Sequence, residues 1–107
     1  MTVYIIQSPL QSRADGKMFP KFDFSQAEKF GKCKVLLPYT HNMTVAEARR
    51  ILKRDLINFS VNDFLLLTGD PAFIGIAFFV AGILSDRVNF LKWDRRSKSY
   101  VSDTFYT

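Results

Sequence analysis

The sequence has one cysteine, Cys33, and one histidine, His41. A single cysteine excludes an internal disulfide framework and fits a reducing compartment. Zinc sites need three or four suitable ligands, usually in close pairs, so we expect no metal site. A Cys–His catalytic pair is formally available, but Cys33 falls in an expected strand, where a free cysteine is usually a small buried apolar residue. We therefore assign no catalytic residue.

The chain also lacks the short motifs of common catalytic and nucleotide sites. We find no nucleophile-elbow serine, no HExxH, no Walker A and no GxGxxG pattern. No charged and apolar leader opens the sequence, so we expect no secretory signal. The longest apolar run, Pro71 to Leu84, is shorter than the ~20 residues of a membrane-spanning helix. The absences favour a non-enzymatic protein without a cofactor.

What the sequence does contain is an apolar core and an excess of basic residues. Its 107 residues, 48% of them hydrophobic, fit a single domain over residues 1–107. The net charge of +5 is uneven, since residues 63–86 carry three aspartates and no base. A basic surplus favours acidic partners such as nucleic acid or an acidic protein.

The first third of the chain predicts two strands joined by a long loop. Residues 2–7 and 32–37 are rich in β-branched and apolar side chains. The segment from Leu10 to Gly31 has no sustained period, but its phenylalanines predict that it folds back onto the body; they are Phe19, Phe22, Phe24 and Phe30. Ser25 and Glu28 have the spacing of a capping box, which indicates one helical turn over residues 25–30.

Residues 44–58 give the clearest helical pattern. Thr44 and Glu47 form a capping box. One side of the expected helix is apolar, with Val45, Ala48, Ile51, Leu52 and Leu56, and the opposite side is basic, with Arg49, Arg50, Lys53 and Arg54. Asp55 falls inside the apolar arc, and we place it at the boundary where the helix ends.

The remainder predicts a strand, a helix and a hairpin. Residues 63–67 read as a buried strand, and Asp70 and Pro71 are typical of a helix start. The helix over residues 71–85 is apolar all round, which predicts cover on more than one side, with Gly75 and Gly82 toward the sheet. Strands over residues 87–93 and 99–105 then form a hairpin around a polar turn. The fold class is α/β: a small, mainly parallel sheet with two main helices and a C-terminal antiparallel hairpin.

Two segments are candidate binding sites. The turn Thr68-Gly69-Asp70 joins a strand to a helix, where open α/β sheets often bind ligands. An N-cap aspartate opposes an anion there, however, so a structural role is the alternative. The hairpin combines bases with rings; alternation places Trp93 with Leu91 on one strand face, at the core or its rim. We consider nucleic-acid or acidic-partner binding by the following bases, against a merely solvated surface: Arg49, Arg50, Lys53, Arg54, Lys92, Arg95, Arg96 and Lys98.

Three strings resemble a family of small uncharacterised proteins encoded by tailed bacteriophages. They are KFGKCKVLLP (Lys29 to Pro38), DFLLLTGDPAFIGIA (Asp63 to Ala77) and VNFLKWDRRSKSY (Val88 to Tyr100). The matching positions are Gly69, Asp70, Pro71, Ile74, Gly75, Leu91, Lys92, Trp93, Asp94, Arg95 and Tyr100. Phe73, Phe78 and Phe79 are bulkier than the residues of the alanine-rich members. The resemblance implies a phage protein in the host cytoplasm and leaves its activity open.

Three function classes follow. The first is a phage accessory protein that binds nucleic acid or the nucleic-acid machinery of the infected host. The second is a protein–protein module, either an inhibitor of a host protein or a homodimer through the apolar helix 71–85, because one small sheet and one helix hardly cover that helix. The third is a small nucleotide-binding protein that uses the turn Thr68–Asp70.

Overall fold

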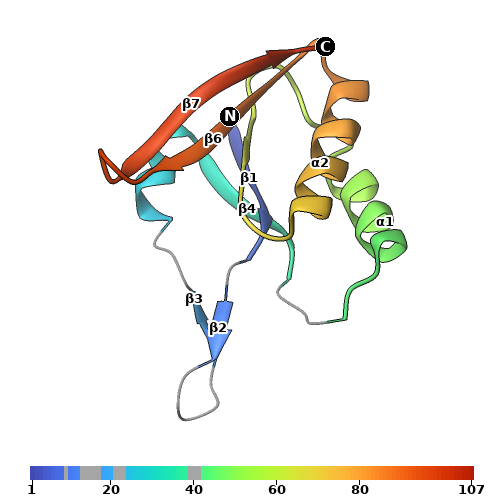
Figure 1. The fold of residues 1–107 in the computed structure, drawn as a ribbon. Coiled ribbons are helices and arrows are strands. Elements are labelled where there is room, and N and C mark those ends of the chain that lie inside the picture. Colours follow the sequence, from blue (N-terminus) through green and yellow to red (C-terminus); the bar gives the residue numbers. More distant parts are fainter. Residues whose placement is uncertain (9, 13–17, 21–23, 39–41) are drawn as a thin grey trace.

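The computed structural model describes residues 1–8, 10–12, 18–20, 24–38 and 42–107 (Figure 1). A five-stranded sheet has the order β4-β1-β5-β6-β7. The first four of these strands pair in parallel and β7 pairs antiparallel to β6. The strands are β1 (Thr2–Gln7), β4 (Lys32–Leu37), β5 (Phe64–Leu66), β6 (Arg87–Asp94) and β7 (Ser99–Tyr106). The predicted fold class is confirmed.

The inner strand β1 divides the core into two clusters by alternation. Tyr4 and Ile6 belong to the cluster beneath the two main helices, whereas Val3 and Ile5 belong to the cluster on the other face. Successive side chains of a strand point to opposite faces, and β1 has a strand on either side. An unbroken apolar strand is therefore what this central position requires.

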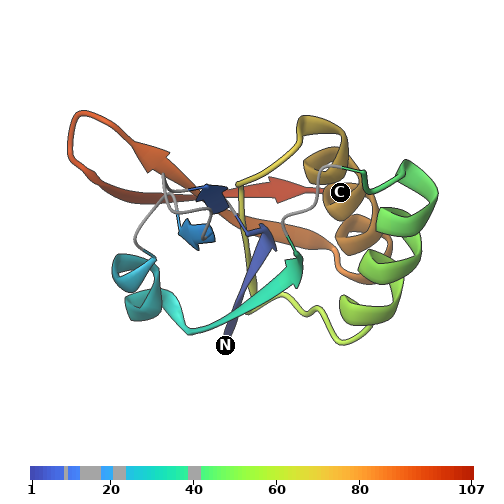
Figure 2. The ribbon, with the colours of Figure 1, turned by 90° about the horizontal axis from the view of Figure 1, so that it is seen from below.

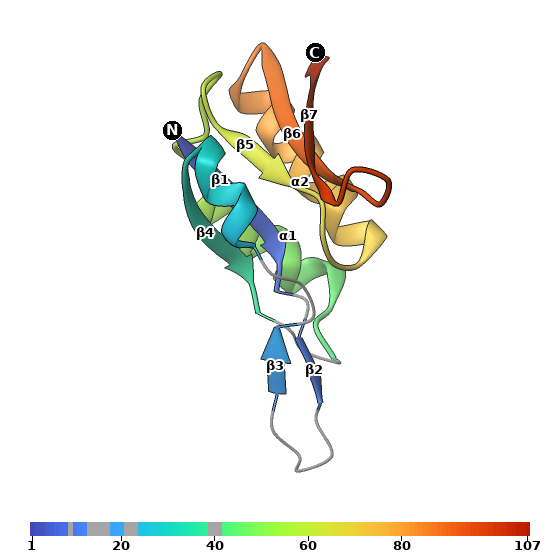
Figure 3. The same ribbon diagram turned by 90° about the vertical axis from the view of Figure 1, so that its left-hand side faces the viewer.

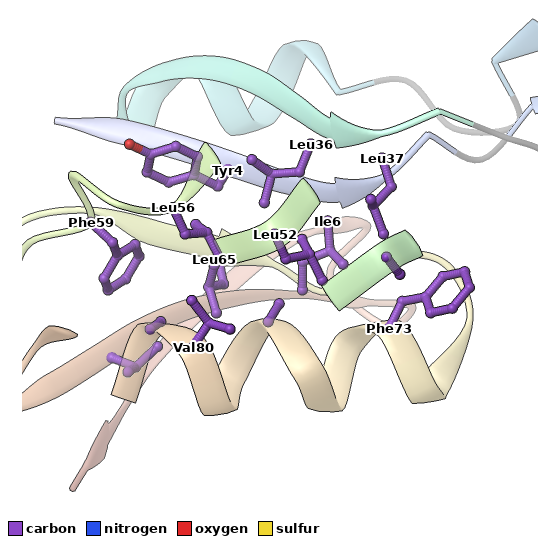
Figure 4. Packing of buried hydrophobic residues seen from close by; sticks show 14 residues of the cluster. Tyr4, Ile6, Leu36, Leu37, Leu52, Leu56, Phe59, Leu65, Phe73 and Val80 are labelled. Atoms are coloured by element: carbon purple, nitrogen blue, oxygen red, sulfur yellow. The ribbon is translucent and has the colours of Figure 1, made fainter. Parts of the chain in front are cut away.

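Helices α1 (Val45–Asp55) and α2 (Pro71–Leu84) cover one face of the sheet. The 3-10 helix η1 (Ser25–Phe30) covers part of the other face (Figures 2 and 3). Figure 4 shows the larger cluster, in which Leu52, Leu56 and Val80 from the helices meet side chains of the sheet. Beneath η1, Ala27, Phe24 and Phe30 pack against Leu66 and Leu91.

Helix α1 begins as its sequence predicts. The Thr44 side chain accepts a 3.1 Å hydrogen bond from the backbone N–H of Glu47. Ala48, Leu52 and the C-cap Leu56 are buried, but Val45 is exposed, so its placement on the buried side was wrong. Asp55 is the last residue of the helix, as expected.

Helix α2 is only half covered, which corrects the prediction of cover on more than one side. Phe73, Ala77, Val80 and Ala81 are buried, whereas Phe79 and Ile83 are 71% and 68% exposed. Gly75 is exposed as well, and a Cβ added there would meet no atom within 4 Å, so it does not bring the helix close to the sheet. Among the described residues, the sheet and α1 pack against one side of α2, and the stripe that carries Phe79 and Ile83 is exposed.

The expected long loop contains structure of its own. Strands β2 (Leu10–Ser12) and β3 (Met18–Pro20) pair antiparallel as a separate two-stranded sheet. Figures 1 and 3 show this ribbon extending away from the main body. The following helix η1 has Phe24 rather than Ser25 at its N-cap, without a side-chain cap, so the capping-box prediction was wrong there. Phe24 and Phe30 fold back onto the core as predicted; Phe22 lies outside the described residues.

The strand order indicates at which edge of the sheet a ligand site is expected. The chain starts at β1, moves to β4 on one side, and then returns across to β5 on the other side. Ligands of open α/β sheets commonly bind beyond the carboxyl ends of strands at such a reversal, here those of β1 and β5. Within the described part of the chain, no helix has the length and apolar character needed to cross a membrane.

Candidate binding sites

At this reversal point, residues of the turn after β5 hydrogen-bond to other residues of the chain. The Thr68 hydroxyl donates a 2.7 Å hydrogen bond to the backbone carbonyl of Gln7, at the end of β1. The backbone N–H of Asp70 donates to the side-chain Oε1 of Gln7 at 2.9 Å. The Asp70 carboxylate accepts a 2.8 Å hydrogen bond from the N–H of Ala72 and caps α2. The polar groups we singled out here therefore have partners within the chain.

Gly69 is required by this arrangement. Its φ of +108° lies in a region that side-chain-bearing residues rarely adopt, and an added Cβ would lie 2.4 Å from the Cβ of Gln7. The glycine thus lets Gln7 occupy the place where a ligand would approach the backbone. This geometry favours the structural reading of Thr68, Gly69 and Asp70.

The turn of the β6–β7 hairpin is ordered by Asp94. One carboxylate oxygen accepts from the backbone N–H of Arg96 at 3.2 Å, and the other accepts from the Ser97 hydroxyl at 2.8 Å. The Ser97 and Ser99 hydroxyl oxygens are 2.7 Å apart. These bonds, the one from Ser97 first, hold the pKa of Asp94 below its ordinary value. Lys98 adopts a left-handed φ of 52°, which closes the turn.

An exposed aromatic ring, Trp93, stands at the start of the basic turn. Trp93 is 41% exposed and contacts Tyr100, its partner across the hairpin, edge to face at a centroid distance of 5.0 Å. The alternation that we predicted for β6 is confirmed, because Val88 and Leu91 belong to the clusters on opposite faces. Trp93 thus lies at the rim of the core. The exposed bases beside it are Lys92, Arg95, Arg96 and Lys98.

Arg95, Arg96 and Lys98 form no ion pair with a carboxylate of the described residues, whereas the charge of Lys92 acts on Asp94. Among the residues that the structure describes, the one ion pair joins Arg54 to Asp55 at 2.9 Å. Asp94 is used by the backbone and hydroxyl groups of the turn instead. The hairpin tip therefore presents positive charge next to an apolar ring.

The four bases of α1 form a second, separate group. Arg49, Arg50, Lys53 and Arg54 are exposed along the helix. Arg54 contacts Asp55, and its hydrogen bond holds the pKa of that carboxyl below the ordinary value. Figures 1 and 2 show the hairpin tip and α1 at opposite ends of the molecule. The structure therefore does not join the two predicted basic groups into one surface.

Sequence reasoning missed a groove between α1 and α2. Its volume is about 490 Å³, and the charged residues in the described part of its lining are Arg49 and Lys53. We call it the α1–α2 groove; its apolar lining includes Ile57, Gly75, Ile76, Phe79, Ile83 and Leu84. The signal was present in the sequence, because a helix that is apolar all round and meets a sheet on one side must leave its other side uncovered.

The remaining chemical candidates lie apart from these surfaces. Cys33 is half-buried on β4, and burial is the main reason that its thiol pKa is raised, with the Glu28 carboxylate contributing. His41 lies outside the described residues, so its relation to Cys33 is not described. Within the described ranges, no three histidine, cysteine or carboxylate side chains cluster as metal ligands do.

Comparison with known proteins gives one match. A family model described as "Phage Pam3 gp32-like protein" matches residues 1–106, nearly the whole chain. Comparisons with curated proteins and with solved structures gave no match.

Proposed function

Because the chain belongs to the phage Pam3 gp32-like family, we propose that it is a phage accessory protein that binds nucleic acid in the infected host cell. The site of contact in this proposal is the tip of the β6–β7 hairpin. The observation that carries the proposal is an exposed ring, Trp93, at the start of a turn whose exposed bases Arg95, Arg96 and Lys98 have no carboxylate partner among the described residues.

The chemistry of this tip suits a single strand. Arginine and lysine side chains neutralise phosphates, and an exposed ring offers a surface on which an unpaired base can stack. Base stacking on an aromatic side chain is sequence-tolerant and contributes about 1–3 kcal/mol per base. The hydrogen bonds of Asp94 hold the turn in one shape, so its cations are presented without a large ordering cost.

The proposal is tested by fluorescence titration with single-stranded DNA and RNA at low salt. Trp93 is the only tryptophan, so quenching of the intrinsic fluorescence reports on this site alone. We expect quenching on binding, and with three phosphate contacts a log–log salt slope of about −2. The variants are compared by the anisotropy of a labelled oligonucleotide, which does not depend on Trp93: Trp93→Leu weakens binding, and so does the triple variant Arg95→Gln, Arg96→Gln, Lys98→Gln.

A matched control separates the site from net charge. Arg49→Gln, Arg50→Gln and Lys53→Gln together remove three charges from α1, at the other end of the molecule. We expect this variant to retain most of the affinity that the hairpin variant loses. Equal losses in the two triple variants, or the absence of binding at low salt, contradict a hairpin site.

A further inference from the structure

The exposed side of α2 combines a protruding side chain with open space one helical turn away. Phe79 projects into solvent with 71% of its surface exposed, one helical turn after Gly75. At Gly75, space for a side chain is open. Ala72, Gly75, Phe79 and Ile83 follow one another at the spacing of a single helix stripe, which is the spacing of a helix–helix contact. The α1–α2 groove runs beside this stripe.

We propose that the α1–α2 groove binds α2 of a second copy of this chain, in a two-fold dimer with the two α2 helices antiparallel. A two-fold axis near Ala77 places Phe79 of each copy opposite Gly75 of the other. Each ring then fills the hollow at the partner's glycine. A two-fold contact uses the same surface on both copies. This stripe has both the protruding ring of Phe79 and the open space at Gly75 that receives it.

The charges of the α1–α2 groove favour α2 of a second copy as its occupant. Helix α2 carries no charged residue from Pro71 to Leu84 and is flanked by two exposed acids, Asp70 and Asp86. Arg87 follows Asp86, but it is half-buried and its Nε donates to the backbone carbonyl of Val61 at 3.4 Å. The groove carries two cations, Arg49 and Lys53, and no acid. An apolar helix with acidic ends is thus the complement of the groove, and α2 is such a helix.

The relative direction of the helices brings these charges together. Helices α1 and α2 each lead back from the end of one parallel strand to the start of the next, so they run in the same direction. An antiparallel second copy therefore brings its Asp86 toward the end of the groove at which Arg49 lies. No charge is buried in the centre, because the long stems of Arg49 and Lys53 can lie along the apolar wall while their head groups reach water.

Sedimentation velocity and light scattering, without nucleic acid, test the dimer from low micromolar to near-millimolar concentration. We expect the mass to rise to that of two chains. Phe79→Asp shifts the protein to monomer. Tyr106→Asp is the matched control, because Tyr106 is an aromatic residue with the same 71% exposure, and it does not line the groove. We expect it to dimerise as the unchanged protein does.

A second variant distinguishes association from folding. Gly75 is exposed and a Cβ added there meets no atom within 4 Å, so Gly75→Leu points its side chain from an open position, and it removes a glycine from a helix interior. We expect its Tm, measured where both proteins are monomeric, to be equal or higher, and its dimer Kd to rise at least tenfold. A strict monomer at every concentration overturns the proposal. So does a dimer that tolerates Phe79→Asp and Gly75→Leu, or one that dissociates with Tyr106→Asp instead.

Discussion

The side-chain Oε1 of Gln7 accepts a 2.9 Å hydrogen bond from the backbone N–H of Asp70. Gln7 ends β1 and Asp70 starts α2, so this bond joins the centre of the sheet to the helix that covers it. Gln7 is a buried polar residue, and its amide nitrogen lies 3.5 Å from the carbonyl oxygen of Pro38. One side chain thus links the carboxyl ends of two strands to the start of a helix.

Replacing Gln7 should lower the free energy of unfolding, because a backbone N–H loses its hydrogen-bond acceptor. Gln7→Ala leaves the N–H of Asp70 without its acceptor, so we expect a loss of about 1–3 kcal/mol in the free energy of unfolding. Urea denaturation measures it. Gln26→Ala, on the exposed surface of η1, is the control and should change the value by less than about 0.5 kcal/mol. Equal stability of both variants contradicts the linking role.

Asp63 fixes the opposite end of the sheet. Its carboxylate accepts hydrogen bonds from the backbone N–H of Thr2 and of Ser60, both at 2.9 Å, and from the Ser60 hydroxyl at 3.2 Å. Hydrogen bonds to a charged group contribute about 1.5–3 kcal/mol, so Asp63→Ala should lower the unfolding free energy by at least about 2 kcal/mol. Asp86→Ala, an exposed aspartate, serves as the comparison, and a similar small effect of both refutes the expectation.

The hairpin turn should lose order in acid. The pKa of Asp94 is below that of the unfolded chain, about 3.9 for aspartate, because Ser97 and the backbone of Arg96 donate to it. Its contribution is therefore present above the unfolded value and is lost as the pH falls through the folded pKa. NMR titration should give a carboxyl pKa below that of an unstructured peptide, and Asp94→Asn should remove the transition from the Arg96 and Ser97 amide shifts. An Asp94 pKa at or above the peptide value would be inconsistent with the turn.

Cys33 should react slowly with alkylating reagents. Burial, and secondarily the nearby Glu28 carboxylate, raise the pKa of its thiol, so less of the reactive thiolate is present at neutral pH. We expect iodoacetamide to modify the folded protein more slowly than the urea-unfolded protein, with a rate that rises at alkaline pH. Equal rates in the folded and unfolded states would show that the thiol is freely accessible.

Local sequence patterns predicted the main helices and strands. The capping box of Thr44 and Glu47 and the Asp70–Pro71 pair marked where the two helices start, and alternation along β6 assigned Val88 and Leu91 to opposite faces. These signals depend on residues within one or two turns or on neighbours in one strand, so the sequence states them directly. They failed at Val45 and Ser25, where packing at the end of an element overrode a local preference.

Which surfaces face one another was decided only by the tertiary structure. Nothing local to Gln7 indicates that its side-chain amide bonds to the backbone of Asp70, because those positions lie 63 residues apart along the chain. Likewise, the basic residues of α1 and of the hairpin look alike in the sequence, but the sheet holds them at opposite ends. The residues of α2 by themselves showed that this helix is hydrophobic. That one stripe of it stays uncovered follows from the strand order, because a helix that packs on a single sheet can bury only the side in contact with that sheet.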